Sequence, residues 1–186
     1  MNKNTKIDSG KILIAEPFML DPNFKKSVIL LCEHNENGSL GFILNKTVNI
    51  KLNELIDDFP EFDTKVFFGG PVAPDTLHYI HNVGELLEDS LKVERGVYWG
   101  GDFDKLKFLI ENEMIQPKNI KFFIGYSGWT EGQLEDELET GSWVVSEMDA
   151  NYAFKSKAYQ LWTQTLQNKG DKFSVIAQIT GDNSLN

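Results

Sequence analysis

A serine between glycines is the first feature of this sequence that suggests catalysis. The Gly-Tyr-Ser-Gly-Trp segment at 125–129 has the outline of a nucleophile elbow, a strained turn that exposes a serine hydroxyl. That elbow needs glycine two residues on either side of the serine, and Trp129 occupies the second of these positions. Thr130 and Gln133 form a capping-box pattern instead, and Trp129 with Leu134 matches a hydrophobic staple. The segment therefore predicts a strand that turns into a capped helix, without a catalytic serine.

Cys32 and His34 form a second candidate pair. They are two residues apart in a predicted strand, a spacing that places both side chains on one face. A thiolate and an imidazole so placed could act as nucleophile and base. The same face also carries Val28 and Leu30, which is more typical of a core cysteine beside a hydrogen-bonded histidine.

His78 and His81 raise the question of a metal site. A spacing of three residues in an extended strand puts them on opposite faces, and no second group of Cys or His lies nearby in the sequence. We therefore predict no metal site and no cofactor, and favour one of these histidines as part of the lining of a pocket.

Three glycine clusters raise the question of phosphate binding: Gly69-Gly70-Pro71, Gly100-Gly101-Asp102, and Gly125 with Gly128. No Gly-x-Gly-x-x-Gly or Walker pattern occurs, so the nucleotide signal is weak. Glycine pairs after strands usually mark bulges or sharp turns. The second cluster opens a predicted helix, whose free amides could hold an anion, but the carboxylate of Asp102 would repel it.

The helix predicted after Thr130 is strongly acidic. It carries five acids and no basic residue, namely Glu131, Glu135, Asp136, Glu137 and Glu139. A solvated face is the usual explanation, and acids in the first turn suit the helix dipole. The acids near its C-terminal end gain nothing from the dipole, so they suggest a docking surface for a basic protein partner.

The composition excludes several classes of protein. The 186 residues carry a net charge of −10, and Lys25-Lys26 is the only basic doublet, so nucleic-acid binding is not expected. The single cysteine excludes an internal disulfide and favours a reducing compartment. No apolar run approaches the roughly 18 residues that a membrane helix needs. We predict a cytoplasmic protein that does not bind membranes, with a flexible N-terminus at 1–10 and one domain at 11–186.

The hydrophobic pattern predicts strands and helices that interleave irregularly. Strands are expected at 11–15, 27–34, 40–45, 65–68, 77–81, 96–99, 120–126 and 142–148, and the second and third form a hairpin. Helices are expected at 52–59, at 103–114 with Asp102 as the cap, and from 154 to a stop at Gly170. Without strict βαβ alternation, this order favours an α+β domain with a mixed sheet.

Motifs in five separate regions cover nearly the whole chain. They are Pro17 to Asn45, Phe68-Gly69-Gly70-Pro71-Val72, Gly96 to Asp102, the 125–129 segment with Gly132-Gln133-Leu134-Glu135, and Gly141-Ser142-Trp143. Together they resemble the YqgE/AlgH family of bacterial proteins. The closing Asn183-Ser184-Leu185-Asn186 is similar to the family's tail, with Asn183 where a proline is more usual.

The resemblance implies a single α+β domain with a largely antiparallel, bifurcated or barrel-like sheet surrounded by helices. It implies no established enzymatic activity and no established DNA-binding element. The AlgH name reflects a proposed role in regulating alginate synthesis. A direct transcription factor is not expected here, because the sequence shows no helix-turn-helix pattern and its net charge is negative.

We therefore expect a non-catalytic binding or regulatory module that contacts a protein or a small molecule. Its candidate ligand-binding residues are polar groups near the glycine-marked turns: His34, Asn45, Asp75, His81, Asp102, Ser127 and Gln133. The alternative is a hydrolase or transferase in which His34 or His81 acts as base beside Ser127, Cys32 or a carboxylate.

Overall fold

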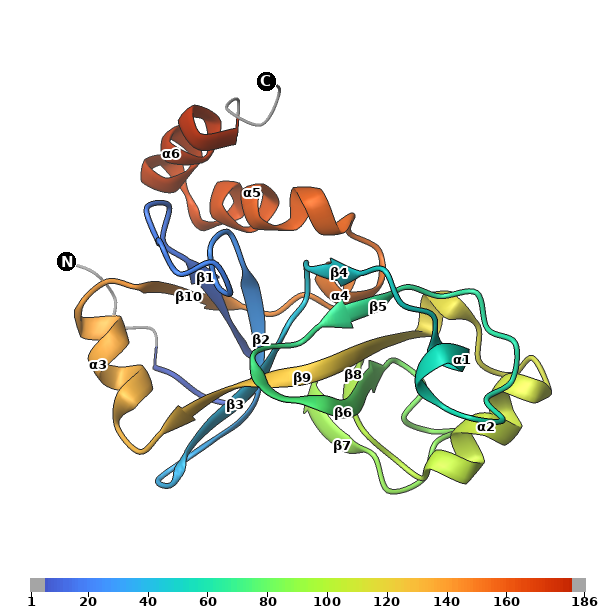
Figure 1. Ribbon diagram of the computed structural model, residues 1–186. Helices are drawn as coiled ribbons and strands as arrows, with labels where there is room; N and C mark the ends of the chain where they lie inside the picture. The colour runs from blue at the N-terminus through green and yellow to red at the C-terminus, as the bar shows by residue number, and fades with distance from the viewer. Residues whose placement is uncertain (1–5, 182–186) are drawn as a thin grey trace.

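The computed structural model describes residues 6–181 of the chain. Within that range ten strands form one curled, mostly antiparallel sheet, with helices packed around it (Figure 1). The strands are β1 (Lys11–Ala15), β2 (Val28–Asn35), β3 (Gly38–Ile43), β4 (Thr47–Val48), β5 (Val66–Phe68), β6 (Val72–His81), β7 (Leu91–Glu94), β8 (Val97–Trp99), β9 (Ile120–Thr130) and β10 (Trp143–Glu147). The helices are α1 (Leu52–Leu55), α2 (Phe103–Glu111), α3 (Gln133–Glu139), α4 (Ala150–Phe154), α5 (Ala158–Lys169) and α6 (Asp171–Gly181), with a 3-10 turn at Pro117–Asn119. The predicted α+β class is confirmed.

The long strand β9 is where the sheet branches. The main path runs β10-β1-β2-β3-β9-β6-β8-β7, and β9 is antiparallel to both of its neighbours on that path. β3 pairs with residues 127–130 of β9, whereas β5 pairs in parallel with residues 122–124. β3 and β5 therefore pair with the same edge of β9 at different positions along the strand. This arrangement is the bifurcated sheet that the family resemblance implied.

Glycine at position 70 permits the crossing from β5 to β6. The chain passes directly over β9 there, and a Cβ atom on Gly70 would collide with the carbonyl group of Tyr126. The backbone also has a positive φ of 155° at Gly70, which side chains disfavour. The first glycine cluster is therefore a structural device that brings two strands into close contact.

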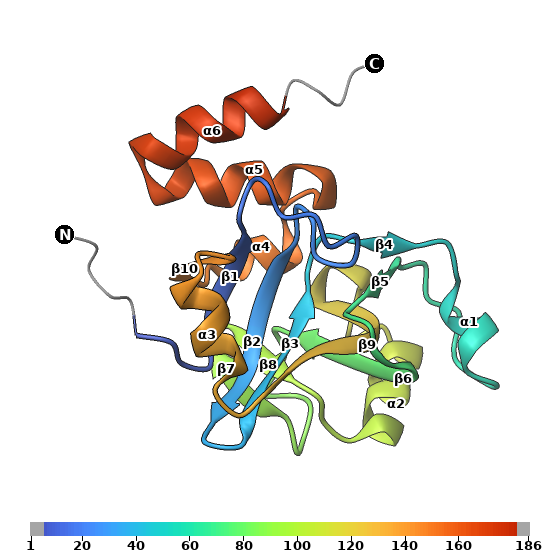
Figure 2. The same cartoon turned by 60° about the vertical axis from the view of Figure 1, so that its left-hand side comes forward.

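Three buried clusters fill the space between the sheet and the helices. One lies under α5 and contains Phe42, Phe123 and Trp162. A second lies between α2 and β9, and a third between α3 and the opposite face of β1, β2 and β3. The indole of Trp162 donates a hydrogen bond to the carbonyl of Ala15 at 2.9 Å, which fixes α5 over β1. Figure 2 shows α5 and α6 stacked above this end of the sheet.

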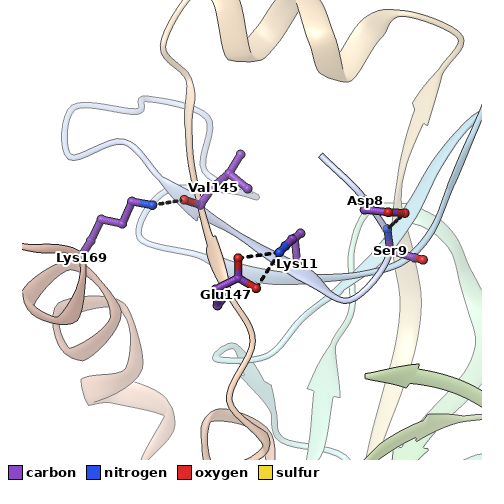
Figure 3. Close-up of polar contacts among 6 residues, drawn as sticks. All are labelled: Asp8, Ser9, Lys11, Val145, Glu147 and Lys169. Atoms are coloured by element: carbon purple, nitrogen blue, oxygen red, sulfur yellow. Dashed lines mark hydrogen bonds and ion pairs between the residues drawn. The ribbon is translucent and has the colours of Figure 1, made fainter. Parts of the chain in front are cut away.

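The edge strand β10 is held by polar contacts along its length (Figure 3). Lys11 on β1 reaches across to the carboxylate of Glu147, with 2.6 Å between Nζ and Oε2. Lys169 at the end of α5 donates to the carbonyl oxygen of Val145 at 2.6 Å. Because an open edge can pair with another chain, this lysine protects β10 as well as anchoring α5.

Several boundaries differ from the sequence prediction. The helix expected at 52–59 is only four residues long, because Ile56 is extended and Asp58 has a positive φ, which turns the chain and buries Phe59. The helix expected to reach 114 ends at Glu111. The last predicted helix corresponds to α5, which begins at Ala158 and, as predicted, stops at Gly170, while Phe154 belongs to the separate helix α4 and α6 follows unpredicted. Within residues 6–181, no helix has the length and apolar character to cross a membrane.

The N-terminal and C-terminal predictions fall partly outside the described residues. Residues 8–11 form a turn in which the amide of Lys11 donates to the carbonyl of Asp8, and the amide of Gly10 donates to Leu31 at 2.8 Å. The predicted flexibility of 1–10 stays a prediction, and the tail from Asn183 lies beyond the described range.

Candidate functional site

Ser127 is a buried structural serine. Its side chain is inaccessible, and its hydroxyl donates a hydrogen bond to the carbonyl of Gly69 at 3.0 Å. Strand β9 continues past it to Thr130, so no strand-to-helix elbow forms at the serine. Ser127 therefore links β9 to the glycine crossing, and its hydroxyl is not exposed to a ligand.

A β-bulge separates Cys32 from His34, so the prediction that they share a face is wrong. The register with β3 shifts between Leu31 and Glu33, and the extra residue reverses the alternation beyond it. Cys32 is buried in the cluster under α5, and burial raises the pKa of its thiol. His34 points to the opposite face, where its Nε2 lies 3.7 Å from Glu135 on α3. The proposed thiolate–imidazole pair does not form.

His34 instead ties the β2–β3 hairpin to α3. Its Nδ1 lies 2.8 Å from the hydroxyl of Ser39, which pairs with it across the hairpin. The nearby Gln133 begins α3, and its side-chain oxygen accepts the amide of Thr130 at 3.0 Å. Half of the predicted capping box is therefore present, but Gly132 is the N-cap residue, and the Thr130 hydroxyl donates to the Gln133 side chain at 3.4 Å.

Among the five acids in this region, Glu137 is bound by two tryptophan side chains. The Oε2 atom of Glu137 accepts hydrogen bonds from the indoles of Trp129 at 2.9 Å and Trp143 at 2.7 Å. This carboxylate holds α3 against the sheet, which explains an acid that the helix dipole does not favour. The other four, Glu131, Glu135, Asp136 and Glu139, are exposed.

His81 is the last residue of β6 and Asp102 precedes α2, a helix that lies at the opposite end of the molecule from α3 (Figure 1). The His81 ring is buried and stacks on Tyr98, with Nε2 2.8 Å from the carbonyl of Gly100. Because Nδ1 accepts the amide of Val83, Nε2 carries the proton and donates to Gly100. Burial lowers the pKa of His81, and the hydrogen bond to Gly100 opposes this shift. Asp102 accepts the amide of Lys105 at 2.6 Å and caps α2, as predicted.

His78 faces the other side of β6, as the spacing of three predicts. Its ring packs against Phe42 and Tyr126, and its Nε2 lies 2.9 Å from the hydroxyl of Thr76. Burial lowers the pKa of His78. Asp75 is exposed in the bulged part of the same strand. Within the described residues no group of three or more His, Cys, Asp or Glu side chains could hold a metal ion.

Asn45, one of the seven candidate ligand-binding residues, lines a large groove beside α5 and α6. It follows β3, where its side-chain oxygen accepts the amide of Val28 at 2.9 Å and its side-chain nitrogen donates to the carbonyl of Lys26 at 2.8 Å. The neighbouring Lys46 donates to the carbonyls of Pro22 at 3.0 Å and Asn23 at 2.6 Å. These bonds fix the β1–β2 loop, residues 16–27, against the link from β3 to β4.

A groove of about 960 Å³ opens between this loop, Asn45-Lys46 and helices α5 and α6. We call it the lysine-lined groove. Its lining is Lys25, Lys26, Asn45, Lys46, Ala158, Tyr159, Gln160, Trp162, Thr163, Gln164, Gln167, Ala177 and Gln178. The described residues that line it include three lysines and no acid, although the whole chain has a net charge of −10. Figure 2 shows the β1–β2 loop reaching the side of α5 that faces the sheet.

The three lysines have different environments. The ammonium of Lys26 lies 5.6 Å from the ring centre of Trp162, a cation–π arrangement. Burial lowers the pKa of Lys46, and the nearby carboxylate of Asp21 opposes this shift. Lys25 is exposed, and its ammonium has no partner within residues 6–181. The groove therefore presents positive charge on side chains whose positions the loop contacts restrict.

A second hollow, of about 470 Å³, lies on the hairpin side of the sheet. Its lining includes Glu33, Leu40, Tyr126, Gly128 and Thr130. Leu40 and Tyr126 pack with the cluster under α5, on the face opposite to the His34 imidazole, whereas Trp129, which also borders the hollow, packs on the α3 side. Ser39 borders the hollow, but its hydroxyl is engaged with that imidazole.

The seven predicted site residues thus occupy separate places. His34 and Gln133 lie near α3, His81 and Asp102 near α2, and Asn45 in the lysine-lined groove, while Ser127 is buried and Asp75 is exposed on β6. Sequence reasoning missed the groove lysines. The one signal for them was the Lys25-Lys26 doublet; Lys46 and α5 approach it only in the folded chain.

The curled, branched α+β domain is also seen in solved structures. Protein DIP2367 from Corynebacterium diphtheriae is 20% identical and superposes with a TM-score of 0.78, over 95% of this chain and 94% of that chain. The family model described as AlgH-like, DUF179, matches residues 12–174, and the chain belongs to this family. The resemblance to the YqgE/AlgH family is confirmed.

Relatives with the name UPF0301 protein match almost end to end. The protein from Chlorobium phaeobacteroides is 40% identical over 177 residues, which is 95% of both chains. The protein from Chlorobaculum tepidum is 42% identical over 168 residues, 90% of both chains. The solution structure of AlgH from Pseudomonas aeruginosa is 28% identical, with a TM-score of 0.74 over 95% of this chain and 96% of that chain.

Proposed function

We propose that the protein is a non-catalytic binding module and that the lysine-lined groove is its ligand-binding surface. The observation that carries this proposal is the groove itself, whose volume of about 960 Å³ lies in the range of small-molecule sites. Its lining combines an aromatic wall with amides and ammonium groups, the mixture that recognises a ligand by shape and by a few polar contacts.

The positions of the nucleophile candidates support a binding function over a catalytic one. Ser127 and Cys32 are buried, and the thiol pKa is raised, whereas an activated cysteine needs a lowered one. Ser39 and His34 are within hydrogen-bond distance of each other. Ser39 borders the second hollow, but the His34 ring with which it pairs is directed toward Glu135 on α3. The hydrolase or transferase alternative therefore lacks a hollow, among the described residues, that both members of this pair line.

A thermal-shift screen of metabolites tests the proposal. A ligand at one hundred times its dissociation constant stabilises by about 2.7 kcal/mol, or about 5–10 °C for a domain of this size. We expect at least one such shift in the wild type and its loss in Gln160→Trp, which fills the groove from an exposed position of α5. Glu111→Trp, at an exposed position of α2, is the control and keeps the shift. Shifts that survive Gln160→Trp would contradict the assignment.

The exposed acids near α3 form a second part of the proposal, as a docking surface for a basic protein. Because the carboxylate of Glu137 is engaged by two indoles, the surface consists of the exposed acids Glu131, Asp136 and Glu139, with Glu135 beside His34 at its edge. Its test is the salt-dependent capture of a lysine-rich peptide, which should weaken in Asp136→Asn but not in Glu111→Gln. A cytoplasmic location and a regulatory role belong to the same proposal.

A further inference from the structure

The charge of the lysine-lined groove is opposite to that of the protein around it. Among the described residues, the charged side chains that line it are three lysines: Lys25, Lys26 and Lys46. The remainder of the chain is strongly acidic, so an anion that approaches elsewhere meets repulsion. A local cluster of cations on such a surface attracts anions that the rest of the surface repels, in addition to contacting them directly.

The fold also holds two of these lysines in place before any ligand binds. Lys46 is bound to two carbonyls of the β1–β2 loop, and Asn45 clamps the backbone of Lys26 and Val28. Partial burial lowers the pKa of Lys46, so an anion beside its ammonium would relieve an unfavourable desolvation. Restricting the Lys46 side chain and the loop backbone in advance reduces the entropy lost when a ligand binds.

The remaining lining suits an organic group attached to the anion. Tyr159 provides exposed aromatic surface beside the nearly buried Trp162, and Thr163, Gln160 and Gln164 provide hydrogen-bond donors and acceptors. The groove volume of about 960 Å³ is far larger than a bare phosphate ion needs. Lysines that act as point charges beside uncharged donors are a common arrangement for phosphate groups.

We propose that the lysine-lined groove binds a phosphorylated small molecule, with the phosphate on Lys25, Lys26 and Lys46 and the organic part against α5. This inference rests on the proposed binding function and adds the chemical class of the ligand.

Isothermal titration with phenyl phosphate and with phenol tests the ligand class, because the two compounds differ only in the phosphate. We expect phenyl phosphate to bind at least about tenfold more tightly than phenol at fixed ionic strength, the ratio that about 1.4 kcal/mol of binding free energy gives. Equal affinities would overturn the phosphate assignment while leaving the binding function intact. No binding of either compound, together with a flat metabolite screen, would overturn both.

Two lysine variants locate the phosphate. Lys25→Gln removes an exposed charge that has no structural contact, and we expect it to weaken phenyl phosphate binding about tenfold, as for the loss of one charge-assisted hydrogen bond. Lys118→Gln removes the same charge from an exposed turn outside the groove and should leave the affinity unchanged. Equal weakening in both variants would show a nonspecific charge effect and overturn the proposal. A parallel titration with vesicles that contain anionic phospholipid is a further check, and binding to the vesicles but not to phenyl phosphate would also overturn it.

Discussion

The substitution Lys121→Met should change how the stability of the protein depends on pH. Lys121 lies on β9 and is only 7% exposed. Its ammonium donates to the carbonyl of Leu44 at 3.0 Å and lies 4.1 Å from the ring centre of Phe67. No carboxylate within residues 6–181 forms an ion pair with it. Burial therefore lowers its pKa from 10.5 to about 7.

The sign of the effect follows from where the proton binds. The unfolded chain keeps a proton on Lys121 up to its ordinary pKa of 10.5, whereas the folded chain releases it above about 7. Between these values the unfolded state binds more protons, so the free energy of unfolding rises with pH. From pH 6 to pH 9 this single group contributes a rise of about 2.5 kcal/mol, and the full effect by pH 10.5 and above is about 5 kcal/mol.

Urea unfolding followed by tryptophan fluorescence at pH 6, 7, 8 and 9 measures the effect. The stability of Lys121→Met minus that of the wild type should fall by about 2.5 kcal/mol over this range, because the variant lacks the titrating group. The contributions of His78 and His81 are common to both proteins and cancel. Lys118→Met, at an exposed lysine, should run parallel to the wild type. A parallel curve for Lys121→Met would refute the lowered pKa and its desolvation cause.

The remaining predictions concern contacts that hold the scaffold, and urea unfolding measures each. Glu137→Ala leaves two buried indole donors unpaired and should destabilise by about 2–4 kcal/mol, whereas Glu139→Ala should change stability by less than about 0.5 kcal/mol. Asn45→Ala should cost about 1–3 kcal/mol and speed amide exchange in the loop that carries the groove lysines; unchanged exchange would show that the side chain does not fix this loop. Gly70→Ala should cost more than about 3 kcal/mol because its Cβ meets backbone, whereas Gly128→Ala, which meets only a side chain, should cost less.

Local sequence signals predicted the parts of the fold that local chemistry determines. The hairpin between β2 and β3 followed from two apolar runs around an Asn- and Gly-containing turn. The start of α2 followed from Asp102, whose side chain makes the predicted cap. The glycine pair at 69–70 was interpreted as a structural turn, and the close approach of β9 explains it.

The failures came from interactions that a linear pattern does not contain. One extra residue at the β2 bulge reversed the face of His34, and the alternation rule had no means of detecting it. The acid Glu137 appeared to lack a local reason, because its partners are indoles on two strands. The groove depends on Asn45 and Lys46, which meet the loop of Lys25 about twenty residues away along the chain.

Chemical-shift mapping on the ¹⁵N-labelled protein with phenyl phosphate tests the central claim most directly. We expect saturable chemical-shift changes in the amides of residues 22–27, of Asn45-Lys46 and of α5. The amide shifts of α2 and α3 should not change. Shifts centred instead on α3 or on the hollow beside Tyr126, or shifts that do not saturate, would contradict the assignment of the lysine-lined groove as the binding surface.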